Sequence, residues 1–221
     1  MNHGFLAIRP PWCAAAAVAA VVALILVGCA QPEAAERSPA AAEAVPAGAT
    51  WGEVARAIGL PDDASRQSGV RAVVLMACST DCPIGNSLAP EIVRLQQEFA
   101  PAGVQWFAIY PDELVNGEKV AKHQKAFSLS MPAYSDETLT VARLAGITTT
   151  PEVCVYAPGG TLVYQGRIDD SWAAIGTRRA APTSRDLRDV LDALSRGTVP
   201  ALRRTQPIGC VLPPPPRRAG A

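Results

Sequence analysis

Two cysteines, Cys78 and Cys82, stand where an apolar run at residues 71–76 changes into a helical pattern. The run reads RAVVLM, and its β-branched residues are typical of a buried strand. Pro83 follows Cys82 at once, and proline is favoured in the first turn of a helix, where its missing N–H needs no partner. The segment therefore predicts a strand, a short cysteine loop and a helix, with a thiol at the start of the helix.

A thiol in that position has the surroundings of a reactive cysteine. The free N–H groups and the positive end of the helix dipole stabilise a thiolate, whereas the carboxylate of Asp81 disfavours a second negative charge. Two other interpretations of the cysteine pair stay open, a structural disulfide and two buried apolar residues. Zinc binding is less favoured, because the usual zinc spacing is shorter and needs two further ligands.

The first residues of the sequence indicate export. Arg9 precedes an apolar run of 14 residues, Cys13 to Leu26, which is too short for a membrane span and fits a signal sequence. The run ends in Leu26-Val27-Gly28-Cys29, which resembles a bacterial lipobox. The resemblance implies removal of residues 1–28, lipidation of Cys29 and a membrane-anchored lipoprotein that faces the periplasm or the cell exterior. An uncleaved anchor and a plain secretory signal are the alternatives.

Composition limits the partners and the number of domains. Acidic and basic residues balance at 20 each, which gives no indication of a nucleic-acid partner. Residues 29–49 are rich in Ala, Pro and Glu without periodicity, and they predict a disordered tether. The remaining chain suffices for one domain with a normal core. We place that domain at residues 50–200 and a Cys-containing, Pro-rich tail at residues 201–221.

Strand and helix patterns alternate through this domain. Thr50 and Glu53 predict a capping box for a short helix at 51–58, which Gly59 closes. Strands are predicted at 71–76, 104–110, 153–156 and 162–165, and helices at 83–99, 116–127, 138–144 and from 183 to 197. The longest helix carries a stripe of core residues, namely Ile84, Leu88, Ile92, Leu95 and Phe99. The order predicts an α/β domain in which helices flank a mixed central sheet.

Three features together resemble thioredoxin-fold proteins of the redoxin family, the group of alkyl hydroperoxide reductase and thiol-specific antioxidant proteins. They are the strand–cysteine–helix unit ending at Cys82-Pro83, the Thr150-Pro151 dipeptide before strand 153–156, and the hairpin and last helix that follow. A narrower resemblance, to an exported bacterial subgroup, rests on DCPIGNSLAPEI, TTTPEV, VYQGRIDD and Ile208-Gly209-Cys210. The resemblance covers about residues 51–200. It implies a thioredoxin-like fold in which Pro151 is cis and faces Cys82.

The sequence also departs from the related groups. The C-x-x-x-C spacing is one residue longer than that of thioredoxins. Peroxiredoxins carry Thr or Ser three residues before the reactive cysteine, which Ser79 matches, and a proline where Leu75 stands. Their peroxide-orienting arginine would begin the strand at residues 151–153, and Arg167 is a candidate replacement. Sco-type copper chaperones share C-x-x-x-C-P, yet Thr149 stands where their third copper ligand is a histidine.

The leading prediction is a lipid-anchored thiol–disulfide oxidoreductase or thiol peroxidase. Cys82 would attack as a thiolate, Cys78 or Cys210 would resolve the mixed disulfide or sulfenic acid, and Pro151 would shape the substrate groove. Protein thiols and disulfides, or peroxide, would be the substrates, and no cofactor is expected. The alternative is a Sco-like copper(I) chaperone that uses Cys78 and Cys82. A third hypothesis is a redoxin scaffold that only binds partners.

Five further residues receive a role at this stage. Cys154 is interpreted as a buried filler of its strand. Cys210 lies in a loop-like segment, and it either resolves Cys82 or closes a structural disulfide. His123 is placed on a solvated helix face among lysines, and Asp169 and Asp170 are placed in a solvated loop.

Overall fold

The computed structural model describes residues 48–61 and 67–213. The signal-like run, the lipobox at Cys29 and almost all of the expected tether lie outside the described residues, as do residues 214–221. In the part that is described, no helix has both the length and the apolar character needed to cross a membrane.

A six-stranded sheet with the strand order β3-β2-β1-β5-β6-β9 forms the centre of the fold. Its members are β1 (Ala72–Ala77), β2 (Val104–Tyr110), β3 (Ala133–Ser135), β5 (Glu152–Tyr156), β6 (Leu162–Gly166) and β9 (Arg203–Arg204). Strand β1 runs parallel to β2 and antiparallel to β5, so the sheet is mixed as expected. Two small sheets pair β4 (Thr149–Thr150) with β10 (Cys210–Val211), and β7 (Trp172–Ala174) with β8 (Thr177–Arg178).

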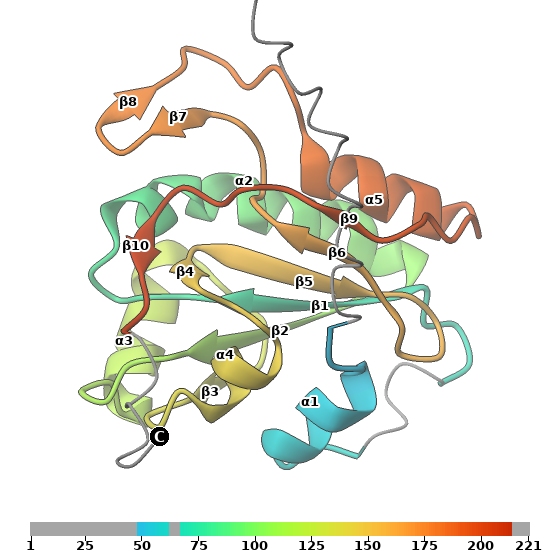
Figure 1. Ribbon diagram of the computed structural model, residues 1–221, viewed down its shortest axis with the longest axis horizontal. Helices are drawn as coiled ribbons and strands as arrows, with labels where there is room; N and C mark the ends of the chain where they lie inside the picture. The colour runs from blue at the N-terminus through green and yellow to red at the C-terminus, as the bar shows by residue number, and fades with distance from the viewer. Residues whose placement is uncertain (1–47, 62–66, 214–221) are drawn as a thin grey trace, which may run out of the picture. The chain divides into compact units, whose positions relative to one another are not determined.

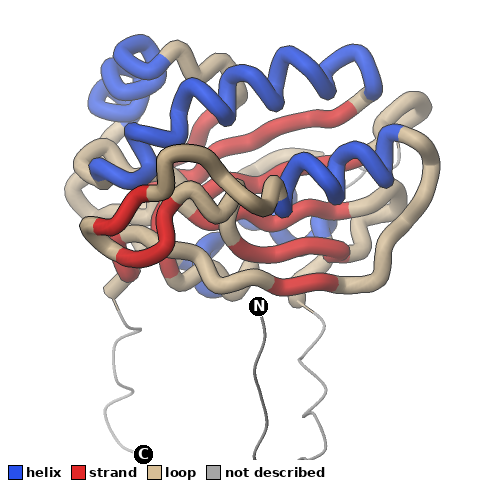
Figure 2. The backbone as a smooth tube through the Cα atoms, turned by 90° about the horizontal axis from the view of Figure 1, so that it is seen from above, coloured by secondary structure: helices blue, strands red, loops and turns tan. Residues whose placement is uncertain are grey.

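Helices cover both faces of the central sheet (Figure 1). One core cluster includes residues of α2 (Pro83–Phe99), α3 (Gly117–Phe127) and α5 (Asp186–Ser195). The other includes residues of α1 (Trp51–Ala57) and α4 (Thr140–Leu144). A short 3₁₀ turn, η2 (Ala100–Ala102), follows α2. Figure 2 looks onto the side of α2 and α5 and shows these helices in front of the strands.

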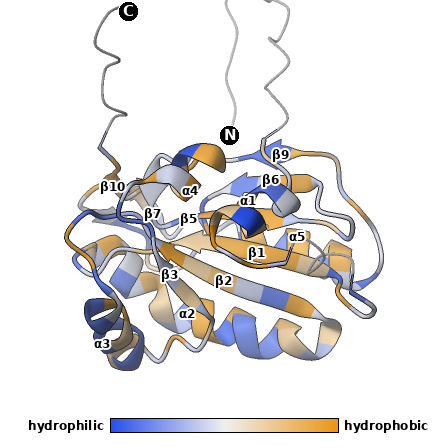
Figure 3. Ribbon diagram, turned by 90° about the horizontal axis from the view of Figure 1, so that it is seen from below, coloured by the Kyte–Doolittle hydropathy of each residue, from blue (hydrophilic) through white to orange (hydrophobic). Residues whose placement is uncertain are grey.

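Strand β1 contributes to both cores because its side chains alternate between the two faces of the sheet. Val74 and Met76 belong to the cluster of α2, whereas Val73 and Leu75 belong to the cluster of α1. Every residue of β1 is buried, which explains why the strand reads as a continuous apolar run. Figure 3 shows β1 in the colour of hydrophobic residues. Burial of each Val or Leu side chain contributes about 1.5–3 kcal/mol to the free energy of folding. The packing of β1 therefore fixes the position of the cysteine loop that follows it.

Most local predictions are confirmed. Thr50 and Glu53 form the expected capping box, and the apolar stripe of α2 is buried. Gly59, Gly146 and Gly197 have positive φ angles after their helices, which is the conformation that glycine permits at a helix end.

The predicted start of the last helix and the loop-like end of the chain are wrong. Helix α5 begins at Asp186 and has no side-chain cap, because the Thr183 hydroxyl is bound to Asp170 instead. Residues 203–204 and 210–211 form strands β9 and β10. Two-residue strands have no periodicity in the sequence, so pattern analysis could not find them.

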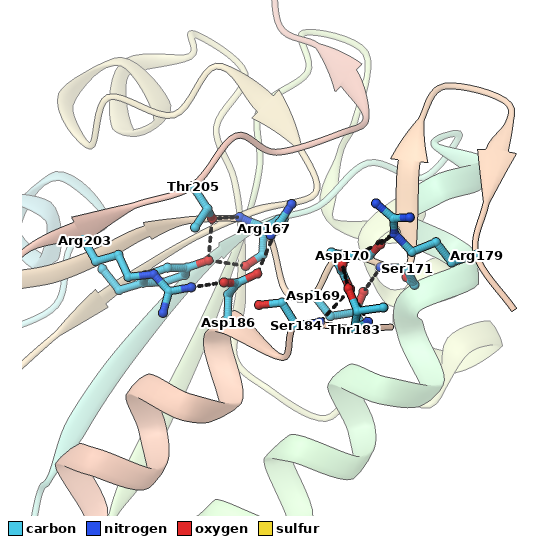
Figure 4. Close-up of polar contacts among 11 residues, drawn as sticks. Arg167, Asp169, Asp170, Ser171, Arg179, Thr183, Ser184, Asp186, Arg203 and Thr205 are labelled. Atoms are coloured by element: carbon cyan, nitrogen blue, oxygen red, sulfur yellow. Dashed lines mark hydrogen bonds and ion pairs between the residues drawn. The ribbon is translucent and has the colours of Figure 1, made fainter. Parts of the chain in front are cut away.

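Asp186 fastens the C-terminal segment to helix α5 and strand β6 (Figure 4). Its buried carboxylate accepts a hydrogen bond from Arg167 Nε at 2.7 Å and pairs with Arg203 of β9. The N–H of Thr205 then donates to the Gln165 carbonyl at 3.0 Å, and the Thr205 hydroxyl accepts from the Arg167 N–H at 3.1 Å. These contacts fix the path along which the chain reaches β10.

Asp169 and Asp170 are buried, which corrects the prediction of solvated loop carboxylates. Asp170 accepts hydrogen bonds from the hydroxyl and N–H of Thr183 and from the N–H of Ser184, and it pairs with Arg179 at 3.4 Å (Figure 4). These hydrogen bonds, led by that of the Thr183 hydroxyl, lower the pKa of Asp170 to about 2. The carboxylate therefore holds the loop that carries β7 and β8 to the start of α5.

The anchoring role of Asp186 can be measured. Asp186→Asn should lower the free energy of unfolding by about 2 kcal/mol, because two arginines lose a buried anionic partner. Asp189→Asn, at an exposed position of the same helix, should change it by no more than about 0.5 kcal/mol. Chemical denaturation of both variants provides the comparison, and equal losses would contradict the anchor.

Candidate active site

Cys82 occupies the N-cap of helix α2. Pro83 is the first residue of the helix, and the N–H of Gly85 donates to Cys82 Sγ at 3.4 Å. The side chain is completely buried. A sulfur that accepts a backbone N–H at a helix start is the arrangement that the sequence predicts, and such donors stabilise a thiolate.

The Thr150–Pro151 peptide bond is cis, as predicted, and it lies against Cys82. The Cys82 thiol donates to the Thr150 carbonyl oxygen at 3.1 Å. A Cβ atom on Gly85 would stand 3.7 Å from Pro151 Cδ and 3.8 Å from Cys82 Sγ. The start of α2 and the loop between β4 and β5 therefore meet at the cysteine.

Cys210 supplies a second sulfur at this place. Its Sγ lies 3.1 Å from Cys82 Sγ, and its thiol donates to that sulfur. The separation exceeds the roughly 2.05 Å of a disulfide, and both cysteines are free. Cys210 is an exposed residue whereas Cys82 is not. Local burial of the sulfur, followed by the hydrogen bond and charge of Cys82, raises the pKa of Cys210 to about 11.

Strand β10 brings Cys210 to the site by pairing with β4. The antiparallel register aligns Cys210 with Thr150, and the N–H of Leu212 donates to the Thr148 carbonyl at 2.8 Å. Gly209 crosses so closely that a Cβ atom there would lie 2.1 Å from the Thr150 oxygen. Only glycine allows this approach. The C-terminal segment is thus an added strand that lies over Cys82, and Figure 1 shows it crossing from β9 to β10.

The other two described cysteines are also buried. Cys78 follows β1, and burial raises its pKa to about 12 although the Tyr110 hydroxyl acts in the opposite direction. Cys154 is fully buried in β5 and donates to the Ala145 carbonyl at 3.7 Å. Burial also raises the pKa of Cys154, which agrees with its interpretation as a core residue.

Ser79, which matched the peroxiredoxin pattern, and Arg167, the candidate replacement for the peroxide-orienting arginine, have other partners. Ser79 Oγ accepts a hydrogen bond from the Asp81 N–H at 3.3 Å, and the Arg167 guanidinium is bound to Asp186. Within residues 48–61 and 67–213, neither side chain forms a hydrogen bond with the Cys82 sulfur.

His123 is not on a solvated helix face, so that prediction is wrong. The residue is 8% exposed, and the two nitrogens of its ring lie 2.8 Å from the Tyr110 hydroxyl and 2.8 Å from Asn86 Oδ1. The neighbouring lysines concealed a helical signal, because Val120, His123 and Phe127 recur at intervals of three and four and share the inner face of α3.

Thr149, which stands where a copper chaperone has its histidine ligand, has a structural role. Thr149 is buried in β4, and its N–H donates to the Glu152 carboxylate at 3.2 Å. Burial raises the pKa of Glu152, while hydrogen bonds from the neighbouring backbone and from Gln165 act against that rise. In the described part of the chain, no three His, Cys, Asp or Glu side chains form a group that could hold a metal ion.

An open pocket of about 360 Å³ adjoins Cys210. Its other lining residues include Ser79, Asp112, Leu114 and Val211, and both Leu114 and Val211 are 78% exposed. A larger pocket of about 830 Å³ lies at α1, α3 and α4, and no cysteine lines it. Of these two pockets, the smaller one borders a thiol.

Comparisons with known proteins give a family and several similar structures. Residues 53–165 match the model of the AhpC/TSA family, and no curated protein sequence matches the chain. An uncharacterized conserved protein from Geobacillus kaustophilus shares 27% identity, with a TM-score of 0.57 over 66% of this chain and 78% of that one. A hypothetical protein from Sinorhizobium meliloti shares 26%, with a TM-score of 0.56 over 65% and 79%. A secreted Mycobacterium tuberculosis disulfide oxidoreductase shares 16%, with a TM-score of 0.40 over 59% and 84%. The family match and the mixed sheet flanked by helices confirm the α/β, thioredoxin-like fold.

The C-terminal strand lies over Cys82, and it can do so because residue 209 is glycine. A substitution at Gly209 can therefore expose Cys82 without replacing a cysteine. Gly209→Ala should increase the rate of Cys82 alkylation by about tenfold, because displacing the crossing strand relieves a steric conflict of at least about 1 kcal/mol. The matched control is Gly117→Ala, because nothing lies within 4 Å of a Cβ atom at that position. Peptide mass spectrometry after iodoacetamide treatment gives both rates. Unchanged labelling of Cys82 in Gly209→Ala would show that the strand does not restrict access.

Proposed function

The chain belongs to the AhpC/TSA family, and on that premise we propose that it is a thiol–disulfide oxidoreductase. In this proposal Cys82 attacks the substrate disulfide and Cys210 resolves the mixed disulfide. The observation that carries the proposal is the 3.1 Å separation of the two sulfurs, which the pairing of β10 with β4 maintains. The Gly85 N–H at the Cys82 sulfur adds the donor that a thiolate nucleophile needs.

The proposed reaction has two exchange steps. The Cys82 thiolate attacks one sulfur of a substrate disulfide, which forms a mixed disulfide and releases a substrate thiolate. The Cys210 thiolate then attacks Cys82 Sγ, which forms the Cys82–Cys210 disulfide and releases the second substrate thiolate. Both released thiolates take a proton from water. The substrate gains two electrons, and an external thiol must reduce the protein before the next cycle.

A protein segment fits the site better than a small peroxide does. Strand β10 already shows that residues 148–150 accept an extended chain by antiparallel pairing, and an extended substrate can use the same edge when β10 leaves it. Exposed Leu114 lies at the pocket beside Cys210, and it offers an apolar contact to a polypeptide. The engagement of Ser79 and Arg167 elsewhere also favours disulfide exchange over peroxide reduction.

The proposal includes a place of action outside the cytoplasm. It rests on the sequence of residues 9–29, with lipid attachment at Cys29 and a tether that joins the lipid to the domain. Disulfides form and persist in oxidising compartments outside the cytoplasm. The partners would be protein thiols and disulfides close to a membrane surface, and nothing in the charge balance favours nucleic acid.

Replacement of single cysteines tests these roles. Cys82→Ser should reduce the rate of insulin reduction by dithiothreitol to the uncatalysed background, because a hydroxyl cannot form the mixed disulfide. Cys154→Ser should retain most of the activity, since Cys154 lies in the core away from Cys82. Insulin turbidity measures both rates. Wild-type activity in Cys82→Ser would remove Cys82 from the proposed reaction.

A further inference from the structure

The C-terminal segment, residues 207–212, lies across the candidate active site with every second residue in contact with the protein body. Ile208 packs against the core cluster of α2, and Leu212 packs against the core cluster of α1. Cys210 stands midway between them, with its sulfur 3.1 Å from Cys82 Sγ. The segment is therefore seated on both sides of its cysteine, and alternate residues of an extended chain provide the contacts.

The surroundings of Ile208 are a nearly filled apolar site. The cavity that remains beside it measures about 10 Å³, which is room for no more than about one water molecule. The other apolar residues that line this cavity are Leu88, Pro151, Ile168 and Trp172. Arg167 and Asp169 also line it, but both have partners. The Arg167 guanidinium is bound to Asp186, and the Asp169 carboxylate accepts from the Ser171 N–H at 2.9 Å.

Trp172 forms a fixed aromatic wall of this site. Its indole N–H donates to Ser87 Oγ at 3.1 Å, and the Ser87 hydroxyl donates to the Ile84 carbonyl in α2 at 2.8 Å. The Arg178 guanidinium lies 5.9 Å from the centre of the indole ring, within the range of a cation–π contact. None of these contacts involves Ile208, so they hold the indole independently of the residue that fills the site.

The backbone of the segment sets a second requirement. Cys210 is aligned with Thr150 in the antiparallel register, and a Cβ atom on the preceding residue, Gly209, would collide with the Thr150 oxygen. Any chain that places a cysteine against Cys82 in this register meets the same carbonyl, and glycine avoids the collision. The residue after the cysteine, Val211, is 78% exposed, so the site makes no comparable demand there.

We infer that the site selects substrate segments in which an aliphatic residue and a glycine directly precede the cysteine of the disulfide that is reduced. Ile208-Gly209-Cys210 is an internal copy of that pattern, and it fills the site until a substrate strand displaces it. Trp172 is the specificity-determining residue for the aliphatic position, and the Thr150 carbonyl is the determinant for glycine. The inference rests on the proposed function, because selection requires that Cys82 attacks a substrate disulfide.

The selected step is the first exchange of the proposed reaction. The Cys82 thiolate attacks the sulfur of the substrate cysteine, which forms a bond between these two sulfurs and breaks the substrate disulfide. The departing sulfur leaves as a thiolate with the electron pair of the broken bond, and it takes a proton from water. Return of the C-terminal segment then removes the substrate strand from β4 and brings Cys210 back to Cys82 for the resolving step.

The experiment compares synthetic peptides whose single cysteine carries a thiopyridyl group. The reference peptide is QPIGCVL, the sequence of residues 206–212, and the protein is the full chain carrying Cys210→Ser, which lacks the exposed thiol. Absorbance of the released thiopyridone gives the second-order rate constant. It should fall about tenfold when alanine replaces the peptide isoleucine, and at least about tenfold when alanine replaces the glycine. The matched control is alanine in place of the peptide valine, which should change it by no more than about twofold.

A variant of the protein tests the aromatic wall. Trp172→Ala should abolish most of the preference for isoleucine over alanine in the peptide, because the aliphatic side chain loses the surface against which it packs. Ile175→Ala changes a 75% exposed residue of the same hairpin, and it should retain the tenfold preference. The C-terminal segment competes equally with every peptide on a given protein, so its effect cancels in these ratios.

Dithiodipyridine, which has no peptide side chains, separates the inference from the proposed function. A Cys82 that reacts neither with dithiodipyridine nor with any peptide, as mass spectrometry would show, would contradict the proposed function. A Cys82 that reacts with dithiodipyridine and with all the peptides at equal rates would overturn the inferred selection alone, and this result needs no variant at Trp172. An isoleucine preference that is unchanged in Trp172→Ala would overturn the role of that residue.

Discussion

The pairing of β10 with β4 is the interaction on which the site depends. It places one sulfur against another because Gly209 lacks the side chain that would collide with the Thr150 carbonyl. The pairing is supported from a distance, since Asp186 binds Arg203 and Arg167 and thereby directs the chain towards the loop at Pro151. Loss of these contacts would leave Cys82 at its helix start without the thiol that faces it.

The thiols near the end of β1 differ in exposure, and the C-terminal strand determines how Cys82 can be reached. Cys210 is exposed, whereas Cys82 and Cys78 are both buried and belong to the same core cluster. A substrate segment that displaces β10 meets Cys82 first. In the proposed reaction, resolution by Cys210 restores the covered state. The protein thus contains its own competitor for the edge that an extended substrate would use.

The sequence predicts those parts of the fold whose causes are local. The β-branched run of β1, the capping box at Thr50 and the apolar stripe of α2 each reflect packing or hydrogen bonding within a few residues, and the structure agrees with them. The place of Cys82 at the N-cap and the cis bond at Pro151 were likewise predictable, the first from Pro83 and the second from a family resemblance.

The remaining features depend on contacts between distant residues. Strand β10 has two residues, and its partner lies about 60 positions earlier in the chain, so no local pattern indicates it. The sequence marks Cys210 as a candidate only because core packing does not explain a cysteine in that segment. The lysines around His123 suggested a solvated helix face, although the spacing from Val120 to Phe127 already placed the ring inward. The hydrogen bonds to Tyr110 and Asn86 could not be foreseen from that spacing alone.

The most direct test of the central claim is identification of the first disulfide that the wild-type protein forms with one equivalent of oxidised glutathione. Rapid acid quenching, proteolysis and mass spectrometry would identify the linked peptides at successive times. The Cys82 and Cys210 peptides should appear linked first, while Cys154 stays a free thiol. Glutathione retained on Cys82, with Cys210 still free at every time, would contradict the pairing of these two thiols in the reaction.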